Sequence, residues 1–342
     1  MTGADTLRMR VLAQEDVIRC GATDPAAVLA AVREAFLLKA AGAAIEPAPA
    51  TVGLDAAPGQ RMVAHAGWLG GPTPVGGVKW ICANGDNPRL RGIPRANALV
   101  ILSDPETGLP RAVVEGTVIS AMRTAGATAL AATVLARPRS TRLAVIGAGV
   151  ANRSQLALLR HVLPKLREVR LYDIDAARAR QWAADEGARH QVEITPVTSA
   201  YQAVRDADVV VCATADSVTG YVEPDWLAPG VFVAGVSHND LTDAAVLAAD
   251  RLVTTDAEGT STAVTRIGRL CGDGRLERSA VDDLGAVVSG AVSGRREPDD
   301  RIVFDAWGLG ILDLAVADMV LRHAEDRDAG QAVPVRGAPH WR

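Results

Sequence analysis

The chain has 342 residues, enough for two domains of ordinary size, and its 49% hydrophobic content is ample for buried cores. A formal net charge of -4 gives no reason to expect a nucleic acid or a membrane surface as partner, so we expect a small-molecule ligand. The four cysteines are widely spaced with no Cys-x-x-Cys pair, which predicts reduced thiols in the cytoplasm and no metal site. No apolar run approaches the ~20 residues of a membrane span, and the N-terminal segment lacks the apolar core of a secretory signal.

The first third of the chain predicts one helix followed by a sheet. Asp24-Pro25 is a favourable helix start, and apolar residues at helical spacing continue to Ala41. The proline- and glycine-rich segment 46–59 indicates a loop or an irregular edge strand. Four runs are typical of strands in an antiparallel or mixed sheet: Arg61–Trp68, Val75–Cys82, Asn97–Leu102 and Arg111–Glu115.

A long helix joins this region to the second half of the chain. From Gly116 to Ala136 the sequence is rich in alanine and predicts a helix, with Arg123 near its middle. The helix leads into Leu143–Ile146, an apolar run typical of a parallel strand buried under helices on both faces. We therefore place a domain boundary here, with residues 126–305 in one domain and residues 1–125 and 306–342 in the other.

A Gly-Ala-Gly turn follows this strand. Gly147 permits a tight turn. Gly149 lets the backbone N–H groups of Val150 and Ala151 approach a pyrophosphate at the positive end of the next helix. The third glycine of the usual dinucleotide fingerprint is absent, because Asn152 occupies its position. On its own the turn is an incomplete match to that fingerprint.

A carboxylate downstream of the turn favours NAD over NADP as the cofactor. Asp173 ends a second strand, Glu168–Tyr172, near the separation of about 20 residues at which an acid hydrogen-bonds the adenosine ribose. Such an acid also repels the 2′-phosphate of NADP. Alternatively, Asp173 and Asp175 only cap the helix that begins near Ala176, and the two roles are compatible.

The rest of the chain continues the alternation of strands and helices that specifies an open parallel sheet covered on both faces. The predicted elements are helix Ala176–Glu186, strand Val192–Pro196, helix Ala200–Arg205, strands Val209–Cys212, Val231–Val236 and Arg251–Thr254, and helix Asp256–Leu270. The final helix, Leu309–Ala324, has a broad apolar face and is expected to pack back on the first domain. The fold class is therefore α/β: a Rossmann-type doubly wound parallel sheet plus a discontinuous α+β domain.

Segments along nearly the whole chain resemble the ornithine cyclodeaminase/mu-crystallin family, in the order found in that family. They are Val75–Trp80, Ile101–Val113, Ser120–Ala132, the Gly-Ala-Gly turn and Tyr221–Gly230. The resemblance implies an NAD-dependent enzyme that forms a homodimer, with a substrate-binding and dimerisation domain beside a Rossmann domain.

By this resemblance, Lys79 and Arg123 hold the substrate carboxylate near the nicotinamide. Cations suit this task, because they fix a carboxylate for hydride transfer without competing for the hydride. Lys79 follows Val78 in a run that should be buried, where an unpaired ammonium is costly. Alternatively, Lys79 could be a lysine at a strand edge that reaches water. Arg123 could alternatively be an ordinary arginine on a helix surface. His65, on an alternating strand, is interpreted as a satisfied core or rim histidine.

The resemblance also assigns four residues to the cofactor. Ala213 and Thr214 end the fourth strand of the Rossmann domain, where the family's backbone flanks the cofactor. Thr124 could donate to a cofactor phosphate or only satisfy the helix backbone. Gly308, before the last helix, resembles the family's glycine near the nicotinamide, although a helix start needs no ligand to explain a glycine.

Arg95 favours one branch of the family, the dehydrogenases that oxidise an adduct of glutamate and 2,3-diaminopropionate in siderophore and peptide antibiotic pathways. A substrate with several carboxylates calls for additional cations, whereas the side-chain ammonium of ornithine calls for an acid. Arg89 and Arg91 in the same loop could be solvated surface charge. The arginine that the family carries near residues 47–52 is missing, which weighs further against ornithine.

Two residues are candidates for proton transfer. The family's catalytic aspartate lies after the fifth Rossmann strand, in a segment that here contains His238 and Asp240. Asp240 aligns with an aspartate of the branch described above, whereas the aspartate of the cyclodeaminases falls nearer His238. Either could act as a general base on the amine or on water. Asp240 and Asp243 could alternatively cap the helix Ala244–Ala248.

We expect an NAD-dependent oxidation at the glutamate Cα of this secondary amine, followed by hydrolysis, with Lys79, Asp240 and His238 as catalytic residues. An ornithine or lysine cyclodeaminase and an imine reductase that uses NAD(P)H are alternatives with the same fold. A ligand-binding protein without activity, as in the mu-crystallin precedent, would keep the cofactor site and lose the proton-transfer group.

Overall fold

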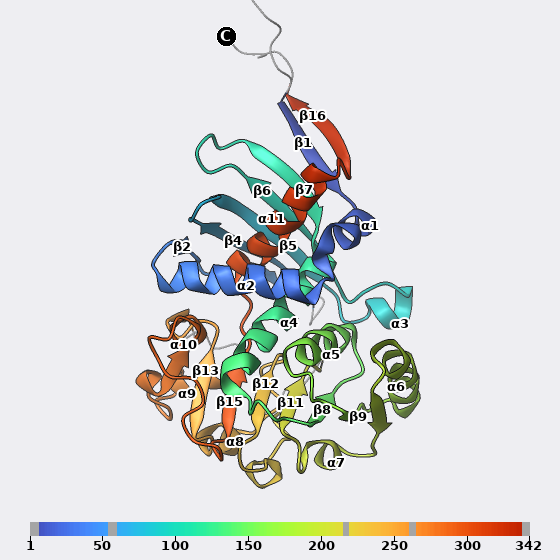
Figure 1. Ribbon diagram of the computed structural model, residues 1–342, viewed down its shortest axis with the longest axis vertical. Helices are drawn as coiled ribbons and strands as arrows, with labels where there is room; N and C mark the ends of the chain where they lie inside the picture. The colour runs from blue at the N-terminus through green and yellow to red at the C-terminus, as the bar shows by residue number, and fades with distance from the viewer. Residues whose placement is uncertain (1–6, 54–59, 215–218, 260–264, 337–342) are drawn as a thin grey trace, which may run out of the picture. The chain divides into compact units, whose positions relative to one another are not determined.

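Two eight-stranded sheets organise the chain, one in each of two units (Figure 1). Unit 1 comprises residues 1–123 and 309–342, and unit 2 comprises residues 124–308. The junctions predicted from the sequence, after residues 125 and 305, lie two and three residues from these boundaries. The computed structural model describes residues 7–53, 60–214, 219–259 and 265–336.

The sheet of unit 1 contains strands from both ends of the chain. They are β1 (Leu7–Leu12), β2 (Ala44–Ile45), β3 (Ala50–Gly53), β4 (Arg61–Leu69), β5 (Val75–Ala83), β6 (Ala96–Ser103), β7 (Pro110–Glu115) and β16 (Gln331–Arg336). Their order is β16-β1-β7-β6-β5-β4-β2, and β3 also pairs with β4. β4 to β7 pair antiparallel, whereas β1 runs parallel to β7. The predicted mixed sheet and its four predicted strands, β4 to β7, are confirmed.

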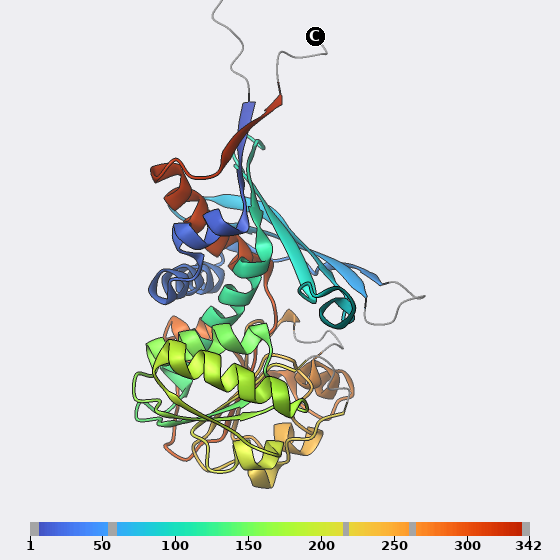
Figure 2. The same ribbon diagram turned by 90° about the vertical axis from the view of Figure 1, so that its right-hand side faces the viewer.

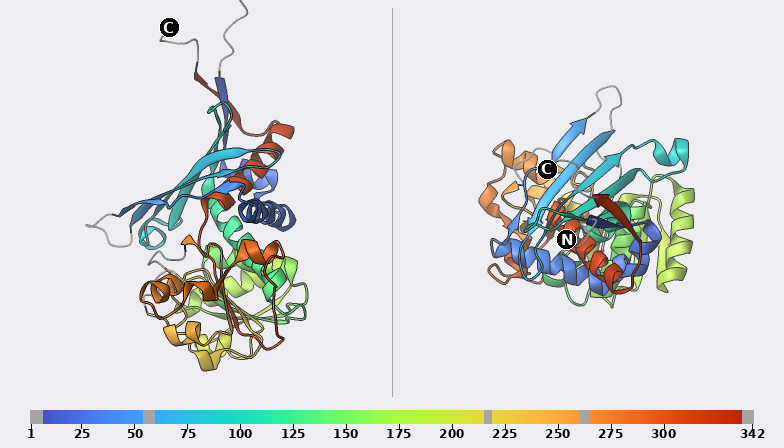
Figure 3. Two further views of the ribbon diagram at one scale, coloured as in Figure 1. Left: turned by 90° about the vertical axis from the view of Figure 1, so that its left-hand side faces the viewer. Right: turned by 90° about the horizontal axis from the view of Figure 1, so that it is seen from above.

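Two helices lie side by side on one face of this sheet, α2 (Pro25–Ala40) and α11 (Gly310–Asp326) (Figures 2 and 3). α2 begins at Asp24 as predicted, because Asp24 Oδ1 accepts hydrogen bonds from the backbone N–H groups of Ala26 (2.9 Å) and Ala27 (3.3 Å). α11 is buried along most of its length and contacts β4 and β5. Shorter helices are α1 (Gln14–Val17), η1 (Ile18–Ala22) and α3 (Asn87–Arg91).

The predicted long helix is α4 (Gly116–Leu135), which continues along the chain from unit 1 into unit 2. By length and composition alone α4 could cross a membrane, which corrects the expectation that no segment approaches a membrane span. The core helix of a soluble protein passes the same test, and 67% of the apolar window of α4 is buried. The apolar character of α4 is therefore explained by its packing inside the fold.

The sheet of unit 2 is parallel throughout, as predicted. Its strands are β8 (Arg142–Ile146), β9 (Glu168–Tyr172), β10 (Glu193–Pro196), β11 (Val209–Cys212), β12 (Phe232–Gly235), β13 (Arg251–Thr254), β14 (Val281–Asp283) and β15 (Ile302–Asp305). Their order is β10-β9-β8-β11-β12-β15-β13-β14. The strand order reverses at β8, which is the point where doubly wound sheets bind their ligands. The Rossmann-type α/β fold class is confirmed.

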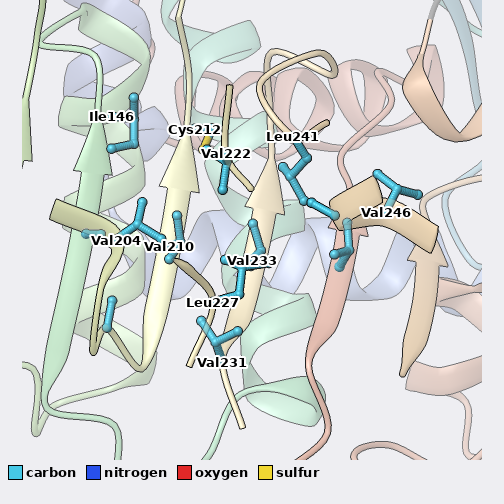
Figure 4. Packing of buried hydrophobic residues seen from close by; sticks show 14 of the residues in the cluster. Ile146, Val204, Val210, Cys212, Val222, Leu227, Val231, Val233, Leu241 and Val246 are labelled. Atoms are coloured by element: carbon cyan, nitrogen blue, oxygen red, sulfur yellow. The ribbon is translucent and has the colours of Figure 1, made fainter. Parts of the chain in front are cut away.

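Helices flank the sheet of unit 2 and bury its strands. They are α5 (Val150–Val162), α6 (Ala176–His190), α7 (Ala200–Val204), α8 (Asp243–Leu247), α9 (Arg266–Gly272) and α10 (Leu284–Val288). All residues of β11, β12 and β15 are buried. Figure 4 shows Ile146, Val210 and Val233 from neighbouring strands packed with Val204 and Val246 in one apolar cluster. This core fixes the carboxyl ends of the strands, where the candidate cofactor residues lie.

The helix predicted over Asp256–Leu270 is wrong in its extent. Residues 257 and 258 form a turn, and α9 begins only at Arg266; residues 260–264 lie outside the described ranges. Thr265 starts α9, because its hydroxyl accepts a hydrogen bond from the backbone N–H of Gly268 (3.0 Å). α9 therefore begins ten residues later than predicted.

Candidate active site

The turn after β8 has the backbone that a phosphate-binding loop needs. Gly147 adopts φ +101°, and its N–H donates to the carbonyl of Tyr172 (2.8 Å). A Cβ on Gly147 would lie 2.8 Å from the carbonyl oxygen of Ala213, so only glycine fits. Gly149 is the N-cap of α5, and a Cβ there would meet nothing within 4 Å. The space beside Gly149 and the N-terminus of α5 suits an approaching anion.

Asn152 explains why the third glycine of the fingerprint can be absent. Its side chain is fully buried, and its Nδ2 donates to the carbonyls of Ile146 (2.9 Å) and Gly147 (2.6 Å). These two bonds hold the end of β8 and the turn in place. The first residues of α5 after the turn, Val150 and Ala151, are exposed and half-buried respectively.

Asp173 lies against the turn. One oxygen accepts a hydrogen bond from the backbone N–H of Ala148 (2.7 Å), and the other accepts from Arg178 Nη2 (2.6 Å). Burial opposes ionisation, but the hydrogen bonds from Arg178 and the backbone lower the pKa of Asp173 below its usual value. The capping role belongs instead to Asp175, which accepts from the backbone N–H groups of Ala177 and Arg178 at the start of α6 (3.0 Å each).

Asp240 is the centre of a buried hydroxyl network. Thr214 Oγ1 (2.7 Å) and Tyr221 OH (2.8 Å) donate to Asp240 Oδ1, and Ser237 Oγ donates to Oδ2. Burial raises the pKa of Tyr221 well above its usual value, helped by nearby Cys212 and Asp240, so this hydroxyl remains a donor. Because three donors occupy its two oxygens, Asp240 is suited to fixing this loop.

His238 forms a different pair at the same edge of the sheet. Its Nδ1 lies 2.6 Å from Asp305 Oδ1, at the end of β15. Its side chain is 20% exposed, whereas that of Asp305 is 6% exposed. His238 has φ +68°, an uncommon conformation for a residue with a side chain. A carboxylate that holds Nδ1 orients the ring and leaves Nε2 for proton exchange, so the geometry favours His238 over Asp240 as the proton-transfer group.

The remaining predicted cofactor residues lie in unit 2. The N–H of Ala213 donates to the carbonyl of Ile146 (3.1 Å), directly beside the glycine turn. Thr214 follows it, and its N–H donates to Ser237 Oγ (3.0 Å). Thr124 and Gly308 are half-buried at the two chain boundaries of the unit.

In unit 1, Lys79 and Arg123 meet on a shared carboxylate that sequence analysis did not identify. Lys79 Nζ lies 2.7 Å from Asp313 Oδ2, and Arg123 Nε donates to Asp313 Oδ1 (3.0 Å). Lys79 is 1% exposed and Asp313 is fully buried, which rules out a lysine that reaches water. Ser120 Oγ on α4 lies 3.4 Å from Lys79 Nζ. The prediction of a buried, paired ammonium at Lys79 is consistent with these contacts.

The charges of this group do not cancel. Burial and the neighbouring Arg123 lower the pKa of Lys79 to about 8, although Asp313 opposes the change. Burial alone would raise the pKa of Asp313, but Arg123 and Lys79 hold it below its usual value. Two cations therefore share one anion, and a buried trio with surplus positive charge favours a second carboxylate as ligand.

Two further titratable groups surround this trio. His65 pairs with Lys79 across β4 and β5, and burial with the charges of Lys79 and Arg123 lowers the pKa of His65 to about 4. Its buried Nδ1 has no partner among the described residues, which corrects the interpretation of a satisfied histidine. Glu46 caps α11 by accepting from the N–H groups of Gly310 (2.8 Å) and Ile311 (2.9 Å). Burial raises the pKa of Glu46 to about 7.

The arginines around α3 separate into two kinds. Arg89 pairs with Asp86 (2.8 Å), and Arg91 donates to Asn87 Oδ1 (3.2 Å), so both are occupied on the exposed surface. Arg95 is half-buried just before β6, and no acid pairs with it in the described part of the chain. This difference agrees with the prediction that Arg95, rather than Arg89 or Arg91, is available to a substrate carboxylate.

A model of the ornithine cyclodeaminase/mu-crystallin family matches residues 10–328. N-((2S)-2-amino-2-carboxyethyl)-L-glutamate dehydrogenase of Staphylococcus aureus is 29% identical over 327 residues, 94% of this chain and 97% of that protein. The structure of Thermococcus litoralis Delta(1)-pyrroline-2-carboxylate reductase with NADH and L-proline has 27% identity and a TM-score of 0.89, covering 95% of this chain and 100% of that chain. An archaeal alanine dehydrogenase dimer with bound NAD has 28% identity and a TM-score of 0.85, with coverages of 96% and 100%.

Proposed function

This chain belongs to the ornithine cyclodeaminase/mu-crystallin family, and we propose that it is an NAD-dependent dehydrogenase of the secondary amine N-(2-amino-2-carboxyethyl)-L-glutamate. NAD⁺, which the glycine turn and Asp173 would hold, would supply the acceptor for the hydride released when the bond between the glutamate Cα and its hydrogen breaks. Water then adds to the resulting carbon–nitrogen double bond of the substrate. The products are 2-oxoglutarate and L-2,3-diaminopropionate, a building block for a siderophore or a peptide natural product.

The observation that carries this proposal is the surplus positive charge buried at Lys79 and Arg123. Both cations contact Asp313, so they are held in fixed positions before a substrate arrives. A substrate carboxylate neutralises the surplus charge and takes a defined orientation, which is the main requirement for transfer of a Cα hydride. Arg95 adds a cation for a further carboxylate, and a substrate such as ornithine offers none.

His238 is the group that we assign to proton transfer. With Nδ1 held by Asp305, its Nε2 can take the proton from the substrate amine and later assist the attack of water. The same carboxyl edge of the parallel sheet carries the turn at Gly147 and the carboxylate of Asp173. We assign Asp240 to a structural role, because it is fully buried and its oxygens are occupied by Thr214, Tyr221 and Ser237, whereas His238 is partly exposed.

The residues of unit 2 fit NAD. Gly147 and Gly149 leave the backbone of the turn open to a pyrophosphate, and the ionised carboxylate of Asp173 lies where an adenosine ribose would be bound. Val150, Ala151, Ala213 and Thr214 would flank the same molecule, and Thr124 and Gly308 complete the set that we assign to it. The relatives with NAD or NADH bound support this choice of cofactor.

Replacing Asp173 with alanine is expected to weaken NAD⁺ binding about 10- to 100-fold, because a charged hydrogen-bond acceptor contributes about 1.5–3 kcal/mol. The preference for NAD⁺ over NADP⁺ should fall as well, since Arg178 loses its partner and can meet a 2′-phosphate. The measurement is the dissociation constant of both cofactors. Asp175→Ala is the control, because Asp175 caps α6 and should lower the melting temperature without changing the cofactor preference.

We also propose a homodimer formed through the outer face of the sheet of unit 1. Trp80, Leu99 and Ile101 lie on adjacent strands of this face and remain 39%, 50% and 40% exposed. Large apolar residues clustered on one surface favour burial against a second copy. The archaeal relative that is described as a dimer supports this assembly.

Ile101→Arg is therefore expected to convert the dimer to a monomer, because a charge placed at the centre of an apolar interface loses its hydration. Light scattering after size-exclusion chromatography measures the mass. Leu109→Arg is the control, since Leu109 is also 40% exposed but lies in the turn before β7. A monomeric wild type, or a dimer that survives Ile101→Arg, would contradict the proposed interface.

The experiment that tests the proposed function follows NADH absorbance after mixing enzyme and NAD⁺ with the glutamate–diaminopropionate adduct or with L-ornithine. Formation of NADH with the adduct alone is the expected result. Proline and ammonia from ornithine, with no signal from the adduct, would instead identify a cyclodeaminase.

A further inference from the structure

A cavity of about 540 Å³ lies at the edge of the unit 2 sheet where its strands begin, and its lining is rich in arginine. Arg142 is the first residue of β8, Glu168 is the first residue of β9, and Asp208 directly precedes β11. The glycine turn follows the opposite end of β8. The cavity is therefore separate from the candidate cofactor site. Its lining arginines are Arg137, Arg139, Arg142 and Arg167.

The two acids in the lining of this cavity already have partners. Asp208 is 7% exposed, and its Oδ1 accepts a hydrogen bond from Arg137 Nη2 (2.7 Å). Its Oδ2 accepts from the backbone N–H of Thr141 (2.8 Å). Glu168 Oε1 lies 2.8 Å from Nη2 of Arg170, which is outside the lining. Neither carboxylate is left to neutralise the other arginines of the cavity.

Three guanidinium groups of the cavity have no such partner. In the part of the chain that the structure describes, no ion pair or hydrogen bond joins the guanidinium of Arg139, Arg142 or Arg167 to another residue. Arg142 lies opposite Glu168 on the neighbouring strand, yet that carboxylate is already paired. The loops that carry these arginines are joined, because the backbone N–H of Arg167 donates to the carbonyl of Thr141 (3.0 Å). Like charges held in one cavity repel one another, and an anion bound between them relieves the repulsion.

The lining also indicates the class of ligand. A guanidinium presents its N–H groups in a fixed fork that matches a carboxylate or a phosphate. The described residues that line the cavity are all charged or polar, so a nucleobase would find no aromatic ring to stack on. The whole chain has a formal net charge of -4, so the excess of positive charge is local to this cavity. A compact ligand made mostly of anionic groups fits these features.

We propose that Arg139, Arg142 and Arg167 bind a compact polyanion in this cavity, a small molecule with two or more closely spaced phosphate or carboxylate groups. Arg137, which Asp208 holds in place, completes the wall of the site. The inference goes beyond the proposed function, because NAD and the amine substrate are assigned to other residues. The polyanion and NADH are therefore expected to bind to one chain at the same time.

The test is titration calorimetry of the NADH-saturated protein with pyrophosphate and with citrate, at a constant ionic strength set with potassium chloride. Saturation with NADH occupies the glycine turn, so heat from pyrophosphate bound there is excluded. Binding of at least one polyanion is the expected result, and the tighter of the two shows whether phosphate or carboxylate groups are preferred. For Arg139→Gln and for Arg167→Gln the dissociation constant should rise about 10- to 100-fold, the size expected for a lost charged hydrogen bond.

Both of these arginines are exposed, so the melting temperature and the dissociation constant of NADH should stay unchanged in the two variants. Arg180→Gln is the matched control, because Arg180 is an exposed arginine on α6 outside the cavity. No binding of either polyanion to the wild type would overturn the site. A loss in Arg180→Gln as large as in the two cavity variants would also overturn it, since the attraction would then be non-specific. Wild-type affinity in both cavity variants would place the polyanion elsewhere and reject the proposal.

Discussion

Replacing His238 with glutamine is expected to lower kcat for oxidation of the adduct about 10²- to 10⁴-fold, the usual contribution of a positioned acid–base group. Glutamine keeps a polar side chain of similar size but cannot exchange a proton near neutral pH. Cofactor binding should remain, because the contacts of Asp173 and the glycine turn do not involve His238.

Two neighbouring variants separate the role of His238 from a general loss of structure. Asp305→Asn should lower kcat about 10- to 100-fold, because Asp305 only orients the imidazole. In the asparagine variant an amide NH₂ group replaces one carboxylate oxygen and cannot accept the hydrogen bonds that hydroxyl groups donate to Asp240. Asp240→Asn should therefore mainly lower the melting temperature. Wild-type kcat in His238→Gln, with a kcat about 10²- to 10⁴-fold lower in Asp240→Asn, would assign proton transfer to Asp240 instead.

Replacing Lys79 with glutamine is expected to lower kcat/KM about 10²- to 10³-fold, because truncating one partner of a buried charge pair costs about 2–5 kcal/mol. The substrate loses one of its two anchors, and Asp313 keeps only Arg123. The wild type should also bind pyruvate more weakly as the pH rises through about 8, where Lys79 loses its proton and its charge. The variant should lack this pH dependence. Titration of the NADH-loaded protein with pyruvate across this range measures it.

Lys165→Gln serves as the control for the loss of a lysine, because Lys165 is exposed on the loop after α5. Melting temperature and NADH binding should be recorded for both variants, since breaking a buried pair also costs stability. A Lys79→Gln protein that folds, binds NADH and keeps wild-type kcat/KM would show that Lys79 does not anchor the substrate.

The sequence predicts the fold well where the local pattern and the final environment agree. The run Leu143–Ile146 is apolar on both faces, and it becomes the buried strand β8. β1 and β16 were not predicted, because Arg8 and Arg10 interrupt the apolar pattern of one and Pro334 interrupts the other. These two strands form because they pair with each other across the length of the chain. Periodicity within a short window carries no information about such a partner.

The same limit applies to the candidate site. Gly147, Asp173 and Lys79 are marked by their local context, as a turn residue, a strand-end acid and a buried cation. Asp313 is not, because its meaning comes from Lys79 and Arg123, which lie far away in sequence. The only local signal for Asp313 was an acidic residue among the apolar residues of the predicted last helix. Asp305 ends the apolar run Ile302–Phe304, as Asp173 ends its own strand, and this parallel could have identified it.

The proposed function depends on the transfer of hydride from the Cα of the glutamate part of the adduct. The most direct measurement uses the adduct with deuterium at this carbon and determines the mass of the reduced cofactor after one turnover. We expect one deuterium in each NADH and an unlabelled 2-oxoglutarate. Unlabelled NADH, or adduct that keeps its deuterium while other amino acids reduce the cofactor, would contradict it.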